Sequence, residues 1–354
     1  HGEVDGIDPR ERLVHVPGRP AVHYDLLSIN TGSRPRTIDV PGALEHALPV
    51  KPIDRWLRHW EALQARVLNR QGDFRLLVVG GGAGGVELAL STRHRLSGLL
   101  RELGDQAPRL HYELLTNGPE ILPTHNAGVR RRFMRVLGER DITVQLNSKV
   151  VRVEPNGVLV ESGDFHPADA VLWVTYAAAP QWPGKSGLAV DGEGFIAVDR
   201  ELRSISHPEI FAAGDIASMP DPRPKSGVFA VRQGPVLTEN LRRAAAGRPL
   251  KPYRPQKRFL GLISTGDTYA VASRGNWSWE GRLLWKWKDW IDRRFMQRFN
   301  ELPEMARETG PDLGGIADAE AIHELSTLAM RCGGCGAKVG STVLSRVINR
   351  LPAQ

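Results

Sequence analysis

Apolar residues recur at three- and four-residue steps between residues 52 and 70, and this spacing predicts an amphipathic helix. Its apolar positions are Ile53, Trp56, Leu57, Trp60, Leu63 and Val67. A continuous apolar run follows at residues 76–79, as is typical of a buried strand. Helical character returns at residues 86–103. The pattern therefore indicates a buried strand between two helices.

This alternation of strands and helices continues further along the chain. Strands are predicted at residues 110–115 and 142–146, with a basic helix at 130–137, and three strands with tight turns at 150–154, 158–161 and 170–175. Such an order is typical of a parallel-sheet nucleotide-binding domain. We expect this domain to occupy residues 73–183, ending at Pro183.

The flanking segments carry strand patterns of their own. Short strands are predicted at residues 3–7, 13–16 and 24–30, then at 210–213, before a helix from about 228 to 246. If residues 1–72 and 184–255 share one sheet, the nucleotide domain is inserted between them. We therefore predict an α/β fold with two Rossmann-like domains, the first split by the second.

Glycines follow the buried strand with the spacing G-x-G-x-x-G, at Gly80, Gly82 and Gly85. Gly80 permits a tight turn, Gly82 lets backbone approach a pyrophosphate, and Gly85 allows the helix to pack closely on the strand. The N–H groups at the helix start are free to bind an anion. This turn predicts a dinucleotide site.

Composition narrows the function classes. The chain has 354 residues with 47 Lys and Arg against 40 Asp and Glu, giving a formal charge of +7, but we find no nucleic-acid-binding signature. Its two cysteines provide no disulfide framework, and no apolar run reaches the roughly eighteen residues of a membrane span. We expect a cytoplasmic protein, or one peripheral on the inner face of the cell membrane, without nucleic acid as partner.

Two further motifs accompany the glycine turn, Thr31-Gly32 upstream and Gly214-Asp215 downstream, each after a short apolar strand. With these three sites in this order, residues 1–300 resemble flavoprotein reductases with two dinucleotide domains, most closely the type II NADH dehydrogenase-like branch. The resemblance implies FAD and NAD(P)H as cofactors. It also places the first FAD-binding glycine motif, and its βαβ unit, before His1, so a fragment is expected.

The resemblance assigns roles to residues on the flavin side. Thr31 and Gly32 resemble the turn at which the chain passes FAD, and Asp215, beside Gly214, resembles the acid that binds the ribityl chain. The helix start near Gln233 and Gly234 resembles the one beneath the pyrimidine edge of the flavin, and Lys225 and Gln233 are the polar candidates nearest the ring. Taken singly, each also has an ordinary explanation as a strand-ending turn, a helix cap or a solvated side chain.

On the nicotinamide side, Glu87 matches a glutamate that this branch keeps near the ring, although an acid in a first helical turn also suits the helix dipole. Thr116 stands where an Asp or Glu should hold the NAD ribose. No arginine adjoins it to bind a 2′-phosphate. The choice between NADH and NADPH therefore stays open.

Residues 256–309 are rich in tryptophan and basic residues. Within 281–299, six basic residues face two acids and alternate with apolar ones, a pattern typical of a helix in a membrane interface. Packing on the flavin domain, or on a second copy in a homodimer, is the alternative.

The tail, residues 310–354, reads as a linker followed by the run Cys335-Gly336-Ala337-Lys338. This run resembles the amino-terminal catalytic stretch of selenide, water dikinase (selenophosphate synthetase), where a Cys and a Lys three residues later serve the active site. The resemblance implies catalytic roles for Cys335 and Lys338 and a natural fusion truncated at both ends. Cys332 and Cys335 lack further ligands for zinc, so no metal site is expected.

Together these features predict an FAD-dependent NAD(P)H oxidoreductase. Hydride would pass from nicotinamide to flavin, and electrons onward to a quinone or a selenium-related acceptor. Two alternatives stay open: a nucleotide-binding fragment without turnover, and part of an ATP-dependent selenide, water dikinase.

Overall fold

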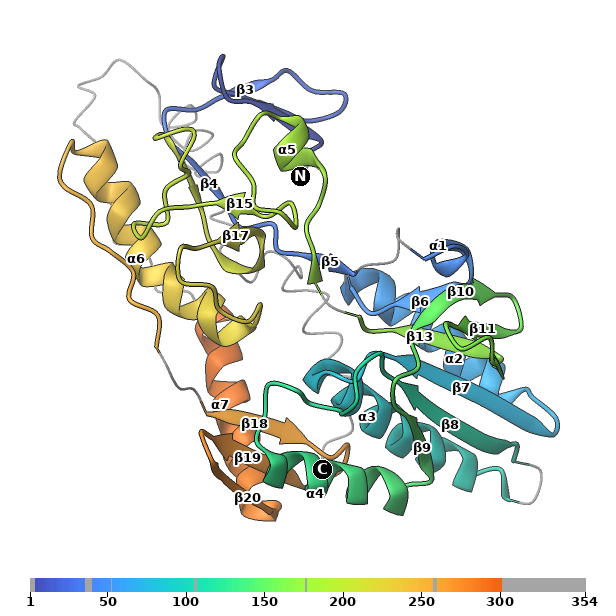
Figure 1. Ribbon diagram of the computed structural model, residues 1–354. Coiled ribbons are helices and arrows are strands. Elements are labelled where there is room, and N and C mark those ends of the chain that lie inside the picture. The colour runs from blue at the N-terminus through green and yellow to red at the C-terminus, as the bar shows by residue number, and fades with distance from the viewer. Residues whose placement is uncertain are drawn as a thin grey trace, which may run out of the picture. The chain divides into compact units, whose positions relative to one another are not determined.

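The computed structural model describes residues 4–35, 40–51, 53–104, 107–175, 177–256 and 260–300 (Figure 1). The chain divides into two compact units, His1–Lys286 and Trp287–Gln354. The division falls within helix α7 (Arg282–Asn300), so the elements before it belong to the first unit.

A five-stranded parallel sheet forms the core of the part of the chain that carries the glycine turn. Its order is β6 (Ala47–Pro49), β13 (Ala170–Trp173), β7 (Asp73–Val79), β8 (Arg109–Leu115) and β9 (Ile142–Gln145). The strands expected around the glycine turn are therefore present and parallel. The edge strand β6 lies within the segment that the sequence assigned to the first domain, so the structure differs there from the expected boundary at residue 72.

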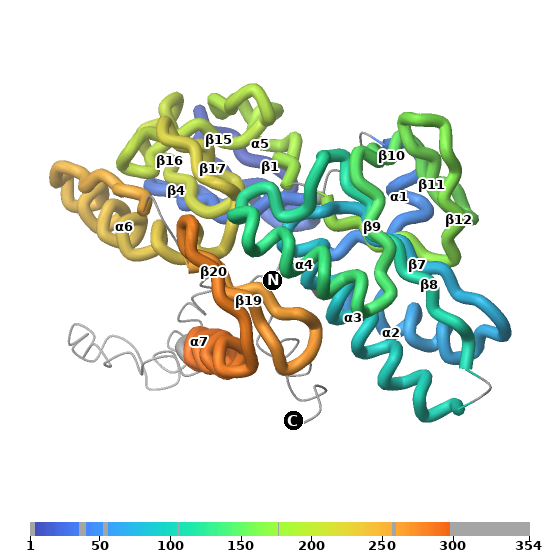
Figure 2. The backbone as a smooth tube through the Cα atoms, turned by 60° about the horizontal axis from the view of Figure 1, so that its bottom comes forward, coloured from blue at the N-terminus to red at the C-terminus, as the bar shows by residue number. Residues whose placement is uncertain are grey.

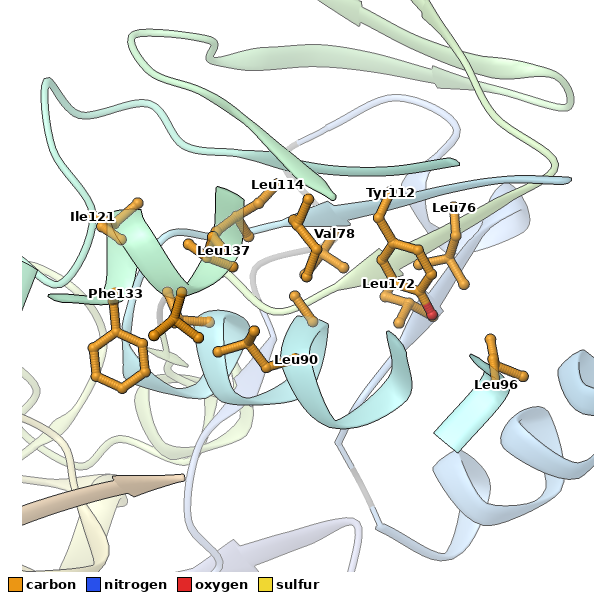
Figure 3. Close-up of a cluster of buried hydrophobic side chains, with 14 of the residues drawn as sticks. Leu76, Val78, Leu90, Leu96, Tyr112, Leu114, Ile121, Phe133, Leu137 and Leu172 are labelled. Carbon is orange, nitrogen blue, oxygen red and sulfur yellow. The ribbon is translucent and has the colours of Figure 1, made fainter. Parts of the chain in front are cut away.

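Successive residues of β7 pack on opposite faces of this sheet, as the twofold period of a strand requires. Leu76 and Val78 join a cluster with helices α2 (Ile53–Leu68), α3 (Ala83–Arg101) and α4 (Ala127–Glu139). Figure 2 shows these three helices side by side, and Figure 3 shows the cluster. The predicted helix at 52–70 thus covers the nucleotide sheet, with Trp56, Leu63 and Val67 in its core.

On the opposite face, Leu77 and Val79 pack against a three-stranded antiparallel sheet and the short helix α1 (Ala43–His46). The strands are β10 (Val150–Glu154), β11 (Gly157–Val160) and β12 (Phe165–Pro167). The central sheet is therefore covered by helices on one face and mainly by strands on the other. Of the three strands predicted there, the third is β13 of the central sheet, and β12 is additional.

The two flanking segments do share a sheet. Strand β4 (Leu27–Ile29) pairs in parallel with β16 (Ile210–Ala212), far later in the chain. Their neighbours are β1 (Gly6–Asp8), β2 (Leu13–His15), β3 (Val22–His23), β15 (Ile196–Ala197), β17 (Ala217–Ser218), α5 (Trp182–Lys185) and α6 (Gly227–Ala245). The pair β5 (Arg34–Pro35) and β14 (Ala177–Ala178) joins the connections to the inserted part. The prediction of an insertion is therefore confirmed.

Another small sheet precedes α7 and was not predicted. Strands β18 (Gly261–Ser264), β19 (Ala270–Arg274) and β20 (Trp277–Gly281) form an antiparallel meander. Its β19 residue Val271 and β18 residue Ile263 belong to the helix-side core of the nucleotide sheet. The region that the sequence marked only as rich in tryptophan thus contributes to that core.

Candidate functional site

The glycine turn has the close packing that its spacing predicts. Gly80 ends β7 with φ +133°, and a Cβ there would lie 2.2 Å from the carbonyl oxygen of Val174. A Cβ at Gly85 would lie 1.8 Å from the carbonyl oxygen of Gly80. Because such separations are far below any real contact, only glycine fits at either position.

Gly82 has a different environment. It is the N-cap of α3, with φ −73° and ψ 176°, and no side chain caps the helix there. A Cβ at Gly82 would meet nothing within 4 Å. No protein atom of the described chain therefore requires glycine here, and the open space adjoins the N-terminus of a 19-residue helix. This is the arrangement in which helix N–H groups bind a diphosphate.

Thr116 follows β8 and lies beneath this turn. Its side chain is 7% exposed, and a Cβ at Gly81 would lie 2.6 Å from its Oγ1. The backbone of Thr116 donates to Gln145 and accepts from Ser148. The hydroxyl therefore packs against the glycine turn, so a contact with ribose stays a prediction.

On the flavin side, the structure brings the turn after β4 beside the turn after β16. The amide of Ala213 donates to the carbonyl of Ile29, and the hydroxyl of Ser33 donates to the Oδ2 of Asp215 at 3.1 Å. Lys51 Nζ lies 3.6 Å from the same oxygen. Asp215 therefore faces the inserted part of the chain, at the carboxyl end of a parallel strand.

Four of the predicted flavin residues line one cavity of about 350 Å³, namely Gly214, Asp215, Lys225 and Gln233. The Oε1 of Gln233 accepts the N–H of Gly214 at 2.5 Å, which ties α6 to the acidic turn. Gly234 and Thr31 do not line this cavity. Gly32 is buried with φ +78°, so it is the turn that lets the chain leave β4.

Two polar atoms in this cavity are buried without a hydrogen-bond partner, the Nε of Arg223 and the Oγ of Ser226. Ser226 is the N-cap of α6, and its side chain makes no capping bond. Burying unpaired donors costs free energy, so acceptor atoms of a molecule in this cavity would stabilise them. The site therefore suits a molecule with several acceptor oxygens.

Lys225 is a second cation of this cavity, beside Arg223. Its Nζ donates to the carbonyl of Ala217 at 2.6 Å and lies 3.9 Å from the centre of the Phe195 ring. Burial lowers the pKa of Lys225, while Asp191 and Asp215 partly oppose the shift. Burial raises the pKa of Asp191, but hydrogen bonds from Ser218 and two backbone N–H groups outweigh it and leave the pKa lowered.

A second cavity, of about 340 Å³, lies where the segment around Ser33 meets the start of α3, and we call it the junction cavity. It is lined by Ser33, Lys51, Gly84, Glu87, Trp173 and Thr175, among others. The Oγ1 of Thr175 is buried there without a partner. Ser33 and Lys51 line this cavity and contact Asp215, which lines the first, so Asp215 adjoins both. Glu87 accepts the N–H of Ser264 at 3.0 Å.

The structure thus places Glu87 of the nucleotide part near the flavin-side residues. Cys335 and Lys338 lie outside the described residues. Sequence reasoning missed Ser33, Lys51, Arg223 and Ser226. Arg223 and Ser226 flank Lys225 in one short run, so proximity in sequence could have indicated them, whereas Lys51 approaches Asp215 only through the fold.

The model of the pyridine nucleotide-disulphide oxidoreductase family matches residues 1–234, more than half of the chain. The chain belongs to this family. The glycine turn and the acidic turn both fall within the matched residues, and the predicted α/β fold with two Rossmann-like parts is confirmed.

Relatives of this family member include two quinone reductases. The chain is 28% identical over 280 residues to an alternative NAD(P)H-ubiquinone oxidoreductase of Arabidopsis thaliana, covering 71% of this chain and 51% of that protein. It is 28% identical over 261 residues to the type II NADH:quinone oxidoreductase NdhA of Mycobacterium tuberculosis, covering 66% and 54%. The chain spans about half the length of these relatives.

Solved structures of the same fold include the sulfide:quinone oxidoreductase of Aquifex aeolicus, with a TM-score of 0.68 and 18% identity over 84% of this chain and 74% of that one. The NDH2 of Plasmodium falciparum, solved in complex with NADH, has a TM-score of 0.69 and 14% identity, covering 83% and 79%. At these identities the likeness concerns the fold.

Proposed function

We propose that this protein is an FAD-dependent NAD(P)H oxidoreductase that passes electrons to a quinone. The observation that carries the proposal is the position of Asp215, which adjoins both cavities and contacts Ser33 and Lys51. A nicotinamide nucleotide held at the glycine turn and a flavin beside Asp215 would therefore border one cleft. The names of the quinone-reducing relatives support the reaction class.

The residues present fit a flavin on chemical grounds. Asp215 offers a carboxylate to ribityl hydroxyls, and the unpartnered Arg223 Nε and Ser226 Oγ offer donors to carbonyl or phosphate oxygens. Lys225 and the N-terminus of α6 add positive potential, which stabilises negative charge by about 0.3–2 kcal/mol for a helix terminus. A bound flavin supplies the hydride acceptance and electron transfer that side chains cannot perform.

The residues of the nucleotide part position the reductant. The N–H groups of Gly82 and the first turn of α3 would hold its diphosphate, and Gly85 keeps the helix close to β7. Trp173 and Val174 line the junction cavity with Glu87, so its walls are partly apolar and exclude water from the reacting rings.

Steady-state turnover tests the proposal. Protein loaded with FAD should oxidise NADH or NADPH at a rate that depends on added ubiquinone-1, and Asp215→Ala should reduce both flavin content and turnover. The control Gly138→Ala, at a helical glycine with nothing within 4 Å, should retain both. NAD(P)H oxidation that does not respond to quinone, with flavin bound, would reject the quinone as acceptor.

A peripheral membrane position is part of the proposal, because quinones are dissolved in lipid. Exposed Trp277 and Trp279 lie in β20, and exposed Leu283 lies at the start of α7, whose residues 287–297 continue the pattern of tryptophan and basic side chains. Among the described residues, no helix is long and apolar enough to cross a membrane. Because basic side chains attract anionic headgroups, co-sedimentation with liposomes should require anionic lipid, and equal binding to neutral liposomes would contradict this interpretation.

A selenium-related acceptor is the second candidate, favoured only by the run from Cys335 to Lys338. Reoxidation of the reduced flavin by a selenium compound, but not by quinone, would support it. Because the resemblance to a selenide, water dikinase covers only residues 330–354, we expect no ATP hydrolysis by this chain. A fragment that only binds nucleotide would bind NADH without reducing flavin, and a homodimer would appear in light scattering.

A further inference from the structure

The small sheet β18–β20 is fastened to the nucleotide part of the chain by contacts along two helices. Asn126 at the start of α4 donates to the carbonyls of Gly275 and Trp277 at 2.9 and 3.2 Å. Arg135 of α4 donates to both carboxylate oxygens of Glu280 at 2.9 and 2.8 Å. These bonds run along the sheet, which therefore holds a defined position against α4.

The turn between β18 and β19 is pressed against α3 at the level of the junction cavity. Gly266 has φ +87°, and a Cβ there would lie 2.4 Å from the carbonyl oxygen of Leu90. The side chain of Asp267 accepts a hydrogen bond from Thr265 Oγ1 at 2.5 Å and forms an ion pair with Arg140. The turn thus has several internal hydrogen bonds, and it contacts α3 at Leu90 and the end of α4 at Arg140.

The turn is connected to the junction cavity through a hydrogen bond to Glu87. The N–H of Ser264, one residue before this turn, donates to the Oε1 of Glu87 at 3.0 Å, and Glu87 lines the junction cavity one turn into α3. Ser264 is the last residue of an edge strand, so its N–H is directed out of the sheet to this carboxylate. A charged acceptor makes such a bond strong.

We infer that residues 264–267, outside both nucleotide-binding segments, are a positioning element that orients the carboxylate of Glu87 toward the nicotinamide side of the cleft. Ser264 acts by its backbone N–H, while Gly266 and the Asp267–Arg140 pair hold the turn against α3 and α4. The role of Glu87 at the nicotinamide rests on the proposed function; the Ser264–Glu87 bond itself does not.

Hydrogen exchange tests the bond without flavin or NADH. The amide of Ser264 should be protected in the unmodified protein and in Glu87→Gln, which keeps an acceptor oxygen. In Glu87→Ala it should exchange about tenfold faster or more. Equal exchange in Glu87→Ala and the unmodified protein would overturn the inference, whatever the enzyme does.

Kinetics test the positioning. In the FAD-loaded protein, Ser264→Pro removes the N–H, and an edge strand tolerates proline where the N–H leaves the sheet. The limiting rate of flavin reduction by NADH should fall about tenfold or more, with the dissociation constants of FAD and NADH within about threefold of the unmodified values. Both Ser264→Pro and Ser264→Ala lose the hydroxyl that accepts the N–H of Gly266 at 3.1 Å, so their difference reports on the N–H of Ser264 alone. Ser264→Ala keeps that N–H and should retain the rate.

A second variant covers the case in which Ser264→Pro does not fold. In Gly266→Ala the new Cβ would clash with the carbonyl oxygen of Leu90, so the turn should move away from α3 and the limiting rate of flavin reduction should fall. Gly247→Ala has a similar positive φ of +62° but nothing within 4 Å, and it should keep that rate. Unchanged limiting rates in folded Ser264→Pro and Gly266→Ala would overturn the inference. No reduction by NADH even in the unmodified protein would instead reject the proposed function.

Discussion

Replacing Gly82 by alanine separates a role in ligand binding from a role in the fold. At φ −73° and ψ 176° an alanine fits the backbone, and its Cβ meets nothing within 4 Å. The free energy of unfolding should therefore stay within about 1 kcal/mol of the original and can rise, because alanine lowers the entropy of the unfolded chain. If a diphosphate occupies the open space, however, the added methyl group displaces it.

The expected loss of affinity follows from the bonds that the displaced diphosphate would lose. A hydrogen bond to a charged group contributes about 1.5–3 kcal/mol, so the loss of one such bond weakens NADH binding by about 10- to 150-fold. Isothermal calorimetry measures this change, and thermal unfolding without ligand measures stability. Gly82→Ala should lower the affinity for NADH without lowering the stability of the protein.

Gly85→Ala provides the contrast. Its Cβ would lie 1.8 Å from the carbonyl oxygen of Gly80, so the helix must move from the strand, at a cost of about 1–3 kcal/mol or more. This variant should lose stability as well as affinity, while Gly138→Ala should lose neither. Unchanged NADH affinity in a folded Gly82→Ala would refute the assignment of the diphosphate to this turn.

Three further predictions concern the neighbouring residues. Asp215→Asn keeps an acceptor for the Ser33 hydroxyl but loses the negative charge. The affinity for FAD, measured by flavin fluorescence, should therefore fall about tenfold with little change in melting temperature. An unchanged affinity would count against the flavin site. Burial lowers the pKa of Lys225 in the folded protein below its usual 10.5. Between that lowered pKa and 10.5 the unfolded chain binds more protons than the folded protein, so the free energy of unfolding increases with pH in this window. Without flavin, Lys225→Met should therefore be more stable than the original near neutral pH, and this advantage should shrink as pH rises through that window; a constant difference would contradict the shift. Thr116 stands where we expect the acid that discriminates against a 2′-phosphate. We therefore predict that kcat/KM for NADH and NADPH agree within about tenfold, and a preference above about a hundredfold would show a discriminating group that we have missed.

The strands and helices around the glycine turn could be predicted because local pattern determines them. The apolar run before Gly80 and the helical spacing at Ile53 to Val67 both persist in the structure, since each pattern matches the period of its element. The parallel pairing of β4 with β16 could be expected only from the order of the motifs. No local pattern specifies which distant strands pair.

The rest of the site depends on contacts between distant segments. Lys51 lies 3.6 Å from Asp215, and Ser264 donates to Glu87, across large separations in sequence that carry no periodic signal. Strand β6, Ala47–Pro49, has no strand pattern in its sequence, and it becomes a strand by pairing with the edge of β13. Strands β18–β20 have only four or five residues each, and the two tryptophans of β20 continue into the tryptophan-rich basic helix that follows, so no separate strand pattern stands out.

Anaerobic mixing of the FAD-loaded protein with NADH tests the central claim most directly. If the glycine turn and Asp215 border one cleft, the visible absorbance of the bound flavin should disappear, and in Gly82→Ala the same loss should require higher NADH. Flavin that remains oxidised in the unmodified protein while calorimetry shows NADH bound would place the two ligands apart, and would contradict the account.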